Sequence, residues 1–199
     1  MMGSLTDLPR GFGDRVADAQ LAFRAALRAL SHPGEVVECL AAAPAVAGLM
    51  PATMALLLAL TDQETPVWWA RDTQARWLRF HTGALAAARV EDAHFAVVPF
   101  SEPLPDLALF NAGSDESPER STTLLLELPS LADGPDAVCS GPGLREPRTV
   151  HLAGLPERFW AQWRDNHARF PSGIDVFFIC GRHIVGLPRT SFVQASGAP

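Results

Sequence analysis

The spacing of apolar residues near the amino terminus is that of an amphipathic helix. One side of this helix carries the large apolar residues Val16, Phe23, Leu27 and Leu30. Asp14 precedes them, and its carboxylate can accept hydrogen bonds from the first free N–H groups of a helix. Pro33 and Gly34 cannot continue a helix easily. The pattern therefore predicts a helix from Asp14 to about Leu30.

A second helix is predicted from Pro51 to Leu60, because proline suits a first helical turn and the segment that follows is apolar in every direction. Such a helix must be covered on all sides. The uncharged run from Cys39 to Leu60 is long enough to cross a bilayer, but Pro44 and Gly48 interrupt it and no arginine cluster flanks it. A loop followed by a buried helix is the better interpretation, and no membrane association is expected.

The rest of the chain alternates between short apolar runs and turn residues. Short strands are predicted at 35–40, 67–69, 95–98 and 124–128. A helix opens at Leu155-Pro156-Glu157 and carries Phe159, Trp160, Trp163 and His167 on one broad face. Residues 174–179 and 183–187 are typical of a hairpin with a glycine turn. Helices at both ends of a strand-rich middle favour one mixed α/β domain over residues 1–199, with flexible ends at 1–13 and 192–199.

The amino-acid composition and the net charge exclude several classes of function. The chain has 199 residues, 48% of them hydrophobic, and a net charge of -6, so bulk attraction to nucleic acid or anionic lipid is not expected. All 16 basic residues are arginine, and tyrosine is absent as well. A Schiff-base lysine, a P-loop lysine and a tyrosine acid are thereby excluded.

The three cysteines are Cys39, Cys139 and Cys180, and they form no C-x-x-C pair. We interpret them as reduced thiols of a cytoplasmic protein, since no secretory signal pattern precedes them. The histidines have no metal-ligand spacing, so no metal site is predicted.

The most polar cluster that leads into an apolar strand is Arg120-Ser121-Thr122. A guanidinium fork followed by hydroxyl groups is suited to a phosphate or phosphonate group. A capped turn at the start of a buried strand explains the same residues. Arg189, followed by Thr190 and Ser191, repeats the theme and is either a second anion contact or part of a surface tail.

Three further segments contain candidate ligand-binding or catalytic residues. A purely structural role explains the same residues. Gly141 and Gly143 permit close approach of a ligand to the backbone, or simply form a tight turn. His81, with Thr82 and Gly83, is expected where a strand formed by residues 76–79 meets a loop; it either hydrogen-bonds the backbone or, with a nearby carboxylate such as Glu64, does acid/base work. Glu64 itself is explained equally by a solvated turn after the second helix. We assign no catalytic residue from the sequence.

Motifs along nearly the whole chain, in order, resemble the PhnH family, subunits of the bacterial carbon–phosphorus lyase system. They are Phe12, Gln20, Phe23-Arg24, Leu30-Ser31-His32-Pro33-Gly34, Asp62-Gln63-Glu64-Thr65-Pro66, Trp77-Leu78-Arg79-Phe80-His81-Thr82-Gly83, Arg120-Ser121, Gly141-Pro142-Gly143, Gly154-Leu155-Pro156, Phe159-Trp160 and Leu187-Pro188-Arg189-Thr190. The sequence departs from relatives at Ala84-Leu85, where some have Cys-Pro, and at Leu144, where isoleucine is familiar.

The resemblance implies a three-layer α/β/α domain with a mixed sheet, similar to the large domain of pyridoxal-phosphate-dependent transferases. Because the chain has no lysine, we expect no covalently bound pyridoxal phosphate and no other cofactor. The resemblance further implies an accessory subunit that acts with PhnG, PhnI, PhnJ and PhnL, forms a homodimer when isolated, and supports formation of ribose 1-methylphosphonate 5-triphosphate from ATP and methylphosphonate.

Two other hypotheses stay open. In the first, Arg120, Ser121, the Gly141 loop and His81 converge on a cleft that binds ATP or a phosphonate. In the second, Glu64 and His81 make the chain an independent enzyme.

Overall fold

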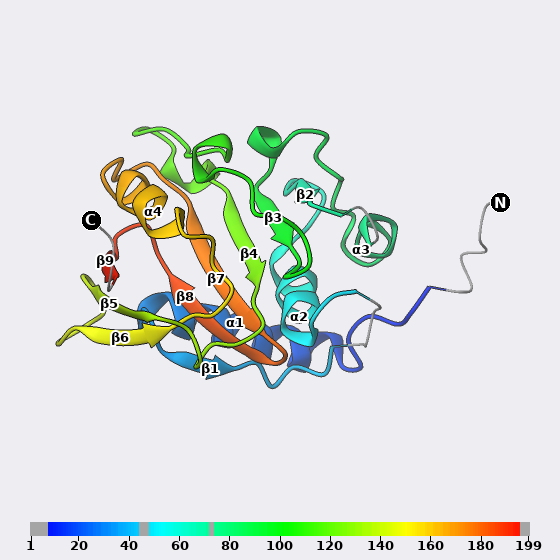
Figure 1. Cartoon of the computed structure of the whole chain (residues 1–199). Helices are drawn as coiled ribbons and strands as arrows, with labels where there is room; N and C mark the ends of the chain where they lie inside the picture. Colours follow the sequence, from blue (N-terminus) through cyan, green and yellow to red (C-terminus); the bar gives the residue numbers. More distant parts are fainter. Residues whose placement is uncertain (1–7, 44–47, 72–73, 196–199) are drawn as a thin grey trace.

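A six-stranded mixed sheet forms the centre of the molecule (Figure 1), which a computed structural model describes for residues 8–43, 48–71 and 74–195. The strand order is β1-β8-β7-β4-β3-β2. Its strands are β1 (Val36–Glu38), β2 (Val67–Trp69), β3 (Phe95–Val98), β4 (Thr123–Glu127), β7 (Asp175–Cys180) and β8 (His183–Leu187). Strands β2, β3, β4 and β7 are parallel, whereas β8 is antiparallel to β7 and to β1. The strands predicted at 35–40, 67–69, 95–98 and 124–128 and the predicted hairpin are confirmed.

Helices cover one face of this sheet. They are α1 (Arg15–Ser31), α2 (Pro51–Leu60) and α3 (Ala75–Thr82). Successive side chains of a strand point to opposite faces, so Leu125 and Phe177 belong to the core beneath α1 and α2, while Leu124, Leu126 and Phe178 belong to the core on the other face.

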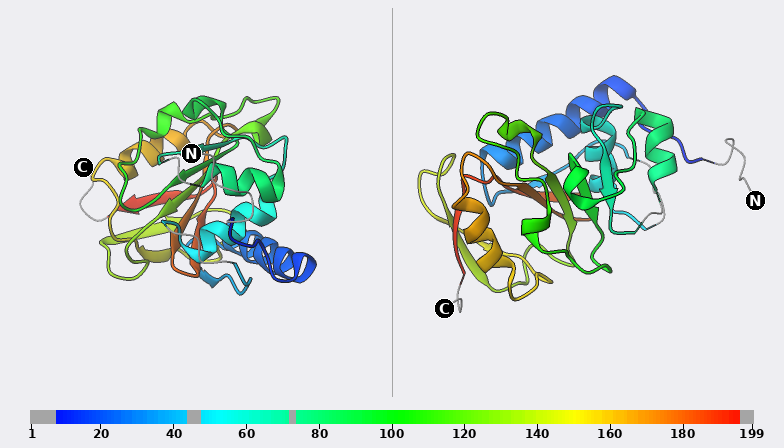
Figure 2. Two further views of the ribbon diagram at one scale, coloured as in Figure 1. Left: turned by 90° about the vertical axis from the view of Figure 1, so that its right-hand side faces the viewer. Right: turned by 90° about the horizontal axis from the view of Figure 1, so that it is seen from above.

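The second face is covered by a mixed layer. Helix α4 (Phe159–His167) lies there beside the short helix η3 (Leu107–Leu109) and a three-stranded sheet of order β6-β5-β9. Its strands are β5 (Asp136–Ser140), β6 (Arg148–His151) and β9 (Phe192–Ala195). Figure 2 shows α1 and α4 on opposite sides of the central sheet. The layered α/β prediction is thus confirmed in its coarse form, with a small sheet added to one outer layer, whereas the likeness to pyridoxal-phosphate transferases stays a prediction.

The flexible ends expected for 1–13 and 192–199 stay a prediction, although residues of both segments make defined contacts in the described chain. Residues 192–195 form β9, which pairs with β5 along Ala137–Ser140. Near the amino terminus, the Pro9 carbonyl accepts a hydrogen bond from the Trp77 indole (2.8 Å), and Phe12 packs against the core. Residues 1–7 and 196–199 lie outside the described residues.

Helix α1 begins as predicted but turns an unexpected side to the core. Asp14 caps it by accepting from Val16 N and Ala17 N. The buried apolar side consists of four alanines, Ala22, Ala25, Ala26 and Ala29. The large apolar residues that the pattern placed together are instead 53–68% exposed at Val16, Phe23 and Leu27.

The reason for this orientation lies in the closeness of α1 to β8. A Cβ at Gly186 of β8 would lie 2.5 Å from the backbone of Ala29. Only small side chains fit between a helix and a strand at that separation, so the alanine side packs inward and the larger side chains face outward.

Residues 76–79 form part of helix α3, and the strand predicted for them is wrong. Trp77 and Leu78 are buried, whereas Arg79 and Phe80 are exposed, which is the distribution of one helical turn. Gly83 ends the helix in the left-handed conformation (φ 82°) and donates its N–H to the Arg79 carbonyl. Gly83 is the residue in the sequence that could have indicated the end of a helix here.

Helix α2 agrees with its pattern, whereas α4 begins at Phe159 and not at the predicted Leu155, so that Pro156 and Glu157 lie before its first turn. Helix α2 starts with Pro51 and buries residues 52–57, although Leu58, Ala59 and Leu60 are only partly covered. In α4, Phe159 and Trp163 are buried and stack with ring centroids 6.4 Å apart. None of the helices among the described residues is both long and apolar enough to cross a membrane.

Candidate functional site

The residues singled out by the sequence gather along the amino-terminal ends of the parallel strands. Glu64 lies just before β2, and Ser121 and Thr122 lie just before β4. Arg189 follows β8, whose last residue pairs with Val176 near the start of β7. In open α/β sheets, ligands generally bind at the carboxyl ends of the strands. The predicted residues therefore lie at the edge where structural roles are more common.

Arg189 has a structural role at this edge. Its guanidinium donates to both carboxylate oxygens of Asp175, to Ser121 Oγ and to the carbonyls of Pro118 and Pro171. The side chain is 13% exposed. Because these acceptors engage its N–H groups, Arg189 ties the loops that precede β4 and β7 to the segment after β8, and the surface-tail interpretation is wrong.

Arg120, Ser121 and Thr122 precede β4 directly but differ in their surroundings. Arg120 is exposed and closes the short helix η4 (Pro118–Arg120). Ser121 is buried against Arg189, and the Thr122 hydroxyl donates to the Ala93 carbonyl (2.7 Å). The two hydroxyl groups thus hold neighbouring segments together, which leaves Arg120 as the exposed member of the predicted anion cluster.

Gly141 and Gly143 belong to the turn between β5 and β6. A Cβ on Gly141 would lie 2.9 Å from the Thr190 carbonyl, and one on Gly143 would lie 2.4 Å from the Ser31 carbonyl. Both glycines permit a close approach of backbone to backbone, as their tight-turn interpretation predicted. Through Thr190 the Gly141 turn lies next to Arg189.

His81 occupies a different part of the edge. Its Nε2 lies 3.0 Å from the Pro9 carbonyl, and its ring packs on Trp77 with centroids 4.8 Å apart. It lines a cavity of about 340 Å³ together with Arg10 and Arg15. The expected convergence with Arg120 has no contact in the described part of the chain to support it.

Glu64 and His81 do not form a described acid–base pair either. Glu64 is exposed in a turn in which its N–H donates to Asp62 Oδ1 (2.9 Å). The neighbouring Thr61 hydroxyl donates to Thr82 Oγ1 (3.3 Å), so the turn and the end of α3 are adjacent. Within residues 8–43, 48–71 and 74–195, no group of His, Cys, Asp and Glu has the arrangement of a metal site.

A carboxylate that the sequence analysis did not single out lies at the opposite, carboxyl edge. Glu127 is the last residue of β4 and is 2% exposed. Its Oε1 accepts from Met50 N (2.7 Å) and Thr53 Oγ1 (2.6 Å). Burial raises the pKa of Glu127, and the hydrogen bonds from Met50 and Thr53 oppose that rise. The signal in the sequence was a charged residue inside the apolar run Leu124-Leu125-Leu126-Glu127-Leu128.

Two cavities flank Glu127. One of about 330 Å³ extends toward Leu104, Leu128 and Pro156, and one of about 260 Å³ extends toward Met50 and Arg71. Pro99, Phe100 and Glu127 line both, and we call the combined space the carboxyl-edge cleft. Its volume is in the range that small-molecule ligands occupy.

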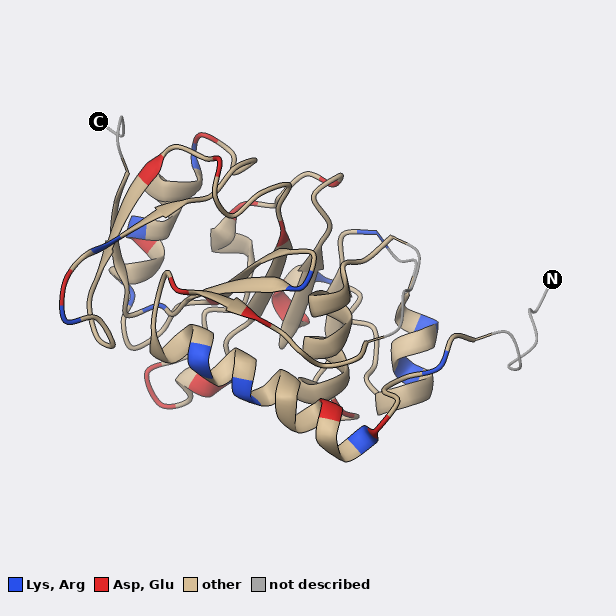
Figure 3. Ribbon diagram, turned by 90° about the horizontal axis from the view of Figure 1, so that it is seen from below, with Lys and Arg blue, Asp and Glu red and all other residues tan. Residues whose placement is uncertain are grey.

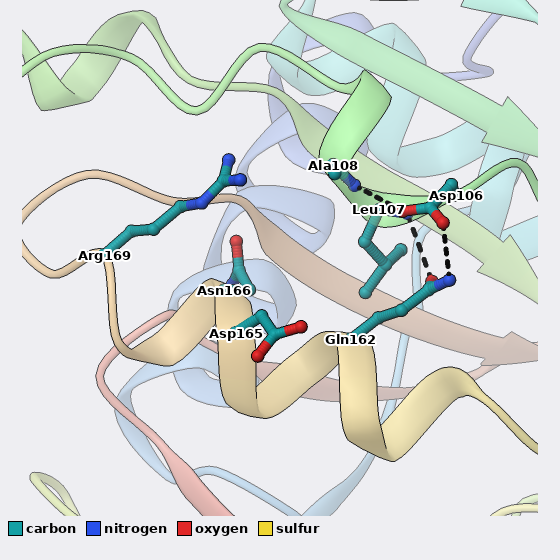
Figure 4. A pocket seen from close by; sticks show the side chains of 7 residues that line it. All are labelled: Asp106, Leu107, Ala108, Gln162, Asp165, Asn166 and Arg169. Atoms are coloured by element: carbon teal, nitrogen blue, oxygen red, sulfur yellow. Dashed lines mark hydrogen bonds between the residues drawn. The ribbon is translucent and has the colours of Figure 1, made fainter.

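A much smaller cavity lies between η3 and α4 (Figure 4). Its volume is about 60 Å³, enough for water but not for a substrate. Gln162 spans it by donating to Asp106 Oδ2 (2.9 Å) and accepting from Leu107 N (3.2 Å). These bonds join the two elements, so the cavity is part of the packing.

The fold and these sites define a class: a mixed α/β protein with ligand-sized cavities at both edges of its parallel strands and an exposed apolar side on its first helix. No catalytic cluster is assembled among the described residues that the sequence singled out. The profile of the family described as bacterial phosphonate metabolism protein (PhnH) matches residues 10–194, and the chain belongs to this family.

Two relatives extend this assignment. The chain is 34% identical over 187 residues to the alpha-D-ribose 1-methylphosphonate 5-triphosphate synthase subunit PhnH of Rhizobium meliloti (strain 1021), with 92% of this chain and 94% of the relative covered. It is 28% identical over 183 residues to HtxG of Stutzerimonas stutzeri, which is named as a candidate C-P lyase subunit, with 90% and 87% covered. The resemblance to the PhnH family is confirmed.

Proposed function

We propose that this chain is an accessory subunit of the synthase that forms alpha-D-ribose 1-methylphosphonate 5-triphosphate in bacterial phosphonate catabolism. The name of the Rhizobium relative supports the reaction, and both relatives are named as subunits. The partners we expect are PhnG, PhnI and PhnJ, with PhnL acting alongside them, and the substrates of the assembly are ATP and methylphosphonate.

The observation that carries this proposal is the exposed apolar side of α1, formed by Val16, Phe23 and Leu27. On a helix with 3.6 residues per turn these positions point away from the buried alanines. Large apolar side chains that stand together on a surface are typical of a protein interface. We therefore propose that this side of α1 binds a neighbouring subunit of the synthase.

The charged residues of α1 indicate which kind of partner surface would fit it. Figure 3 shows the charged positions of α1, and the exposed residues beside its apolar side include Arg24 and Arg28. Arg28 is partly neutralised by Glu35, 2.6 Å from its Nη2, while Arg24 bonds only weakly to Gln20 (3.4 Å). A partner surface with an apolar centre and carboxylates at its rim fits this arrangement.

Co-expression with the partner subunits tests the proposal. A tagged form of this chain is expected to retain PhnG, PhnI and PhnJ through purification at physiological salt. Recovery of the tagged chain alone, while the other three subunits assemble with one another, would contradict the subunit role. When expressed by itself, the chain is expected to form a homodimer, which light scattering would measure.

A second candidate function is the binding of a phosphate or phosphonate group near His81. The cavity beside His81 is also lined by Arg10 and Arg15, and both guanidinium groups can donate hydrogen bonds to an anionic ligand. Titration of ATP and methylphosphonate into the isolated chain tests this function. Saturable binding that weakens in Arg15→Gln would support it, and the absence of saturation at millimolar ligand would remove it.

Two further expectations accompany the proposed role. The chain has no lysine, so pyridoxal phosphate has no residue with which to form the usual covalent linkage. Purified protein is therefore expected to lack the absorption of that cofactor. We also propose a cytoplasmic location, where ATP is available and the three thiols stay reduced.

A further inference from the structure

Glu127 combines deep burial with incomplete use of its hydrogen-bonding capacity. Its side chain offers two acceptor oxygens, and Met50 N and Thr53 Oγ1 both donate to Oε1. In the part of the chain that the structure describes, Oε2 has no corresponding donor. Among the described residues, Oε2 does not belong to the enclosed side-chain atoms that lack a partner, so it keeps some access to solvent, and such access at a buried strand residue needs an explanation.

The location of Glu127 provides one. It lines both cavities of the carboxyl-edge cleft, and because Oε1 is occupied, Oε2 is the atom it can offer to a ligand there. The cleft lies at the carboxyl ends of β3 and β4, the edge at which parallel sheets bind small molecules. Glu127 is thus placed as an acceptor for a ligand donor group.

The other walls limit the shape of that ligand. Phe100 lines both cavities and is 63% exposed, so its ring is available to a planar group. Leu104, Leu128 and Pro156 add apolar surface on one side. A flat ring system would bury its faces against these side chains while its edge reached Glu127.

The charged residues that line the cleft limit the net charge of a ligand that can bind there. Arg71 lines one cavity of the cleft and Glu102 the other, and the two form an ion pair, with Nε 3.6 Å from Oε1. With Glu127 included, the cleft carries no excess positive charge, and an anionic group would gain little there. A neutral ring that donates a hydrogen bond suits it better.

We propose that the carboxyl-edge cleft binds a neutral nucleobase that carries an exocyclic amino group, with the amine donating to Glu127 and the ring stacked on Phe100. This site is distinct from the α1 interface and from the His81 cavity, and it does not depend on the subunit role. Adenine and unsubstituted purine are matched probes, because they share the ring system and differ in the amino group.

The test is to measure the affinity of both bases for the full chain by NMR titration. Adenine is expected to bind saturably at millimolar concentration. Its affinity should be about tenfold higher than that of purine, because one good hydrogen bond contributes about that factor. The variant Glu127→Gln keeps an oxygen for Met50 and Thr53 but places an NH2 group where Oε2 stood. It is expected to bind adenine and purine equally.

Two controls make the outcome decisive. Glu119→Gln changes an exposed residue of η4 at the other edge of the sheet and is expected to bind adenine as the unmodified chain does. Phe100→Leu removes the ring at an exposed position, so the chain should stay folded and bind both bases several-fold more weakly. Thermal unfolding of each variant verifies the fold.

The proposal would be overturned by either of two results. One is the absence of saturable adenine binding by the unmodified chain. The other is an adenine preference that persists in folded Glu127→Gln, which would restrict Glu127 to holding the start of α2. Neither result would alter the co-purification expected for the subunit role, so the two proposals fail independently.

Discussion

Arg189 and Asp175 form the most enclosed ion pair among the residues that the structure describes, with Nη2 2.6 Å from Oδ2 and side chains that are 13% and 19% exposed. Asp175 also accepts the backbone N–H of Arg189 (2.7 Å). One arginine and one aspartate thereby hold the amino ends of β4 and β7 against the chain that leads into β9. The pair stabilises the sheet edge where the sequence placed an anion site.

The first prediction concerns the stability that this pair provides. Arg189→Met leaves Asp175, Ser121 and two carbonyls without their donor, and the free energy of unfolding is expected to fall by about 3–5 kcal/mol. Arg120→Met, a change at an exposed arginine 69 positions earlier in the chain, is expected to change it by about 0.5 kcal/mol or less. Urea unfolding measures both, and equal stability of the two variants would contradict the role assigned to Arg189.

The second prediction concerns the close contact of α1 with β8. Gly186→Ala would place a Cβ 2.5 Å from the backbone of Ala29, so helix and strand must move apart at a cost of about 1–3 kcal/mol. Gly13→Ala is the matched control, since its Cβ would meet no heavy atom closer than 3.7 Å. Thermal unfolding should separate the two variants, and an unchanged melting temperature in Gly186→Ala would show that the contact is not restrictive.

The third prediction concerns the cysteines. Burial raises the pKa of the Cys139 thiol to about 11, whereas Cys180 is partly exposed at the end of β7. At pH 8 a maleimide is expected to label Cys180 in the native chain and to leave Cys139 unlabelled, and mass spectrometry would identify the sites. Labelling of all three cysteines is expected only after unfolding in denaturant.

The same pKa has a consequence for stability at high pH. Between the ordinary thiol value of 9.0 and about 11, the unfolded chain releases the Cys139 proton while the native chain keeps it. The unfolded state is favoured as pH rises, so stability falls across this interval. Cys139→Ala is expected to reduce that slope, and an unchanged slope would mean that Cys139 does not contribute to it.

Local patterns were sufficient to predict much of the fold. The Asp14 cap, the proline at the start of α2, the strands of the central sheet and the β7–β8 hairpin each depend on residues close together in the chain. The side of α1 that is buried could not be predicted in this way. It depends on Gly186, which approaches Ala29 across more than 150 residues.

The site was harder to predict than the fold. Arg189 and Ser121 were identified as residues with notable chemistry, but their mutual contact, and that of Arg189 with Asp175, exists only in the folded chain. Glu127 was overlooked because a glutamate within an apolar strand has no motif, and its importance follows from Met50 and Thr53, which lie more than 70 positions away.

The subunit role depends most directly on the apolar side of α1. Phe23→Asp, in the middle of that side, is to be compared with Leu109→Asp, a similarly exposed apolar position beside α4. Each tagged variant would be co-expressed with PhnG, PhnI and PhnJ, and the amount of partner retained would be quantified after purification. We predict a loss of at least tenfold for Phe23→Asp and none for Leu109→Asp, whereas full retention by a folded Phe23→Asp variant would contradict the proposal that α1 binds a neighbouring subunit.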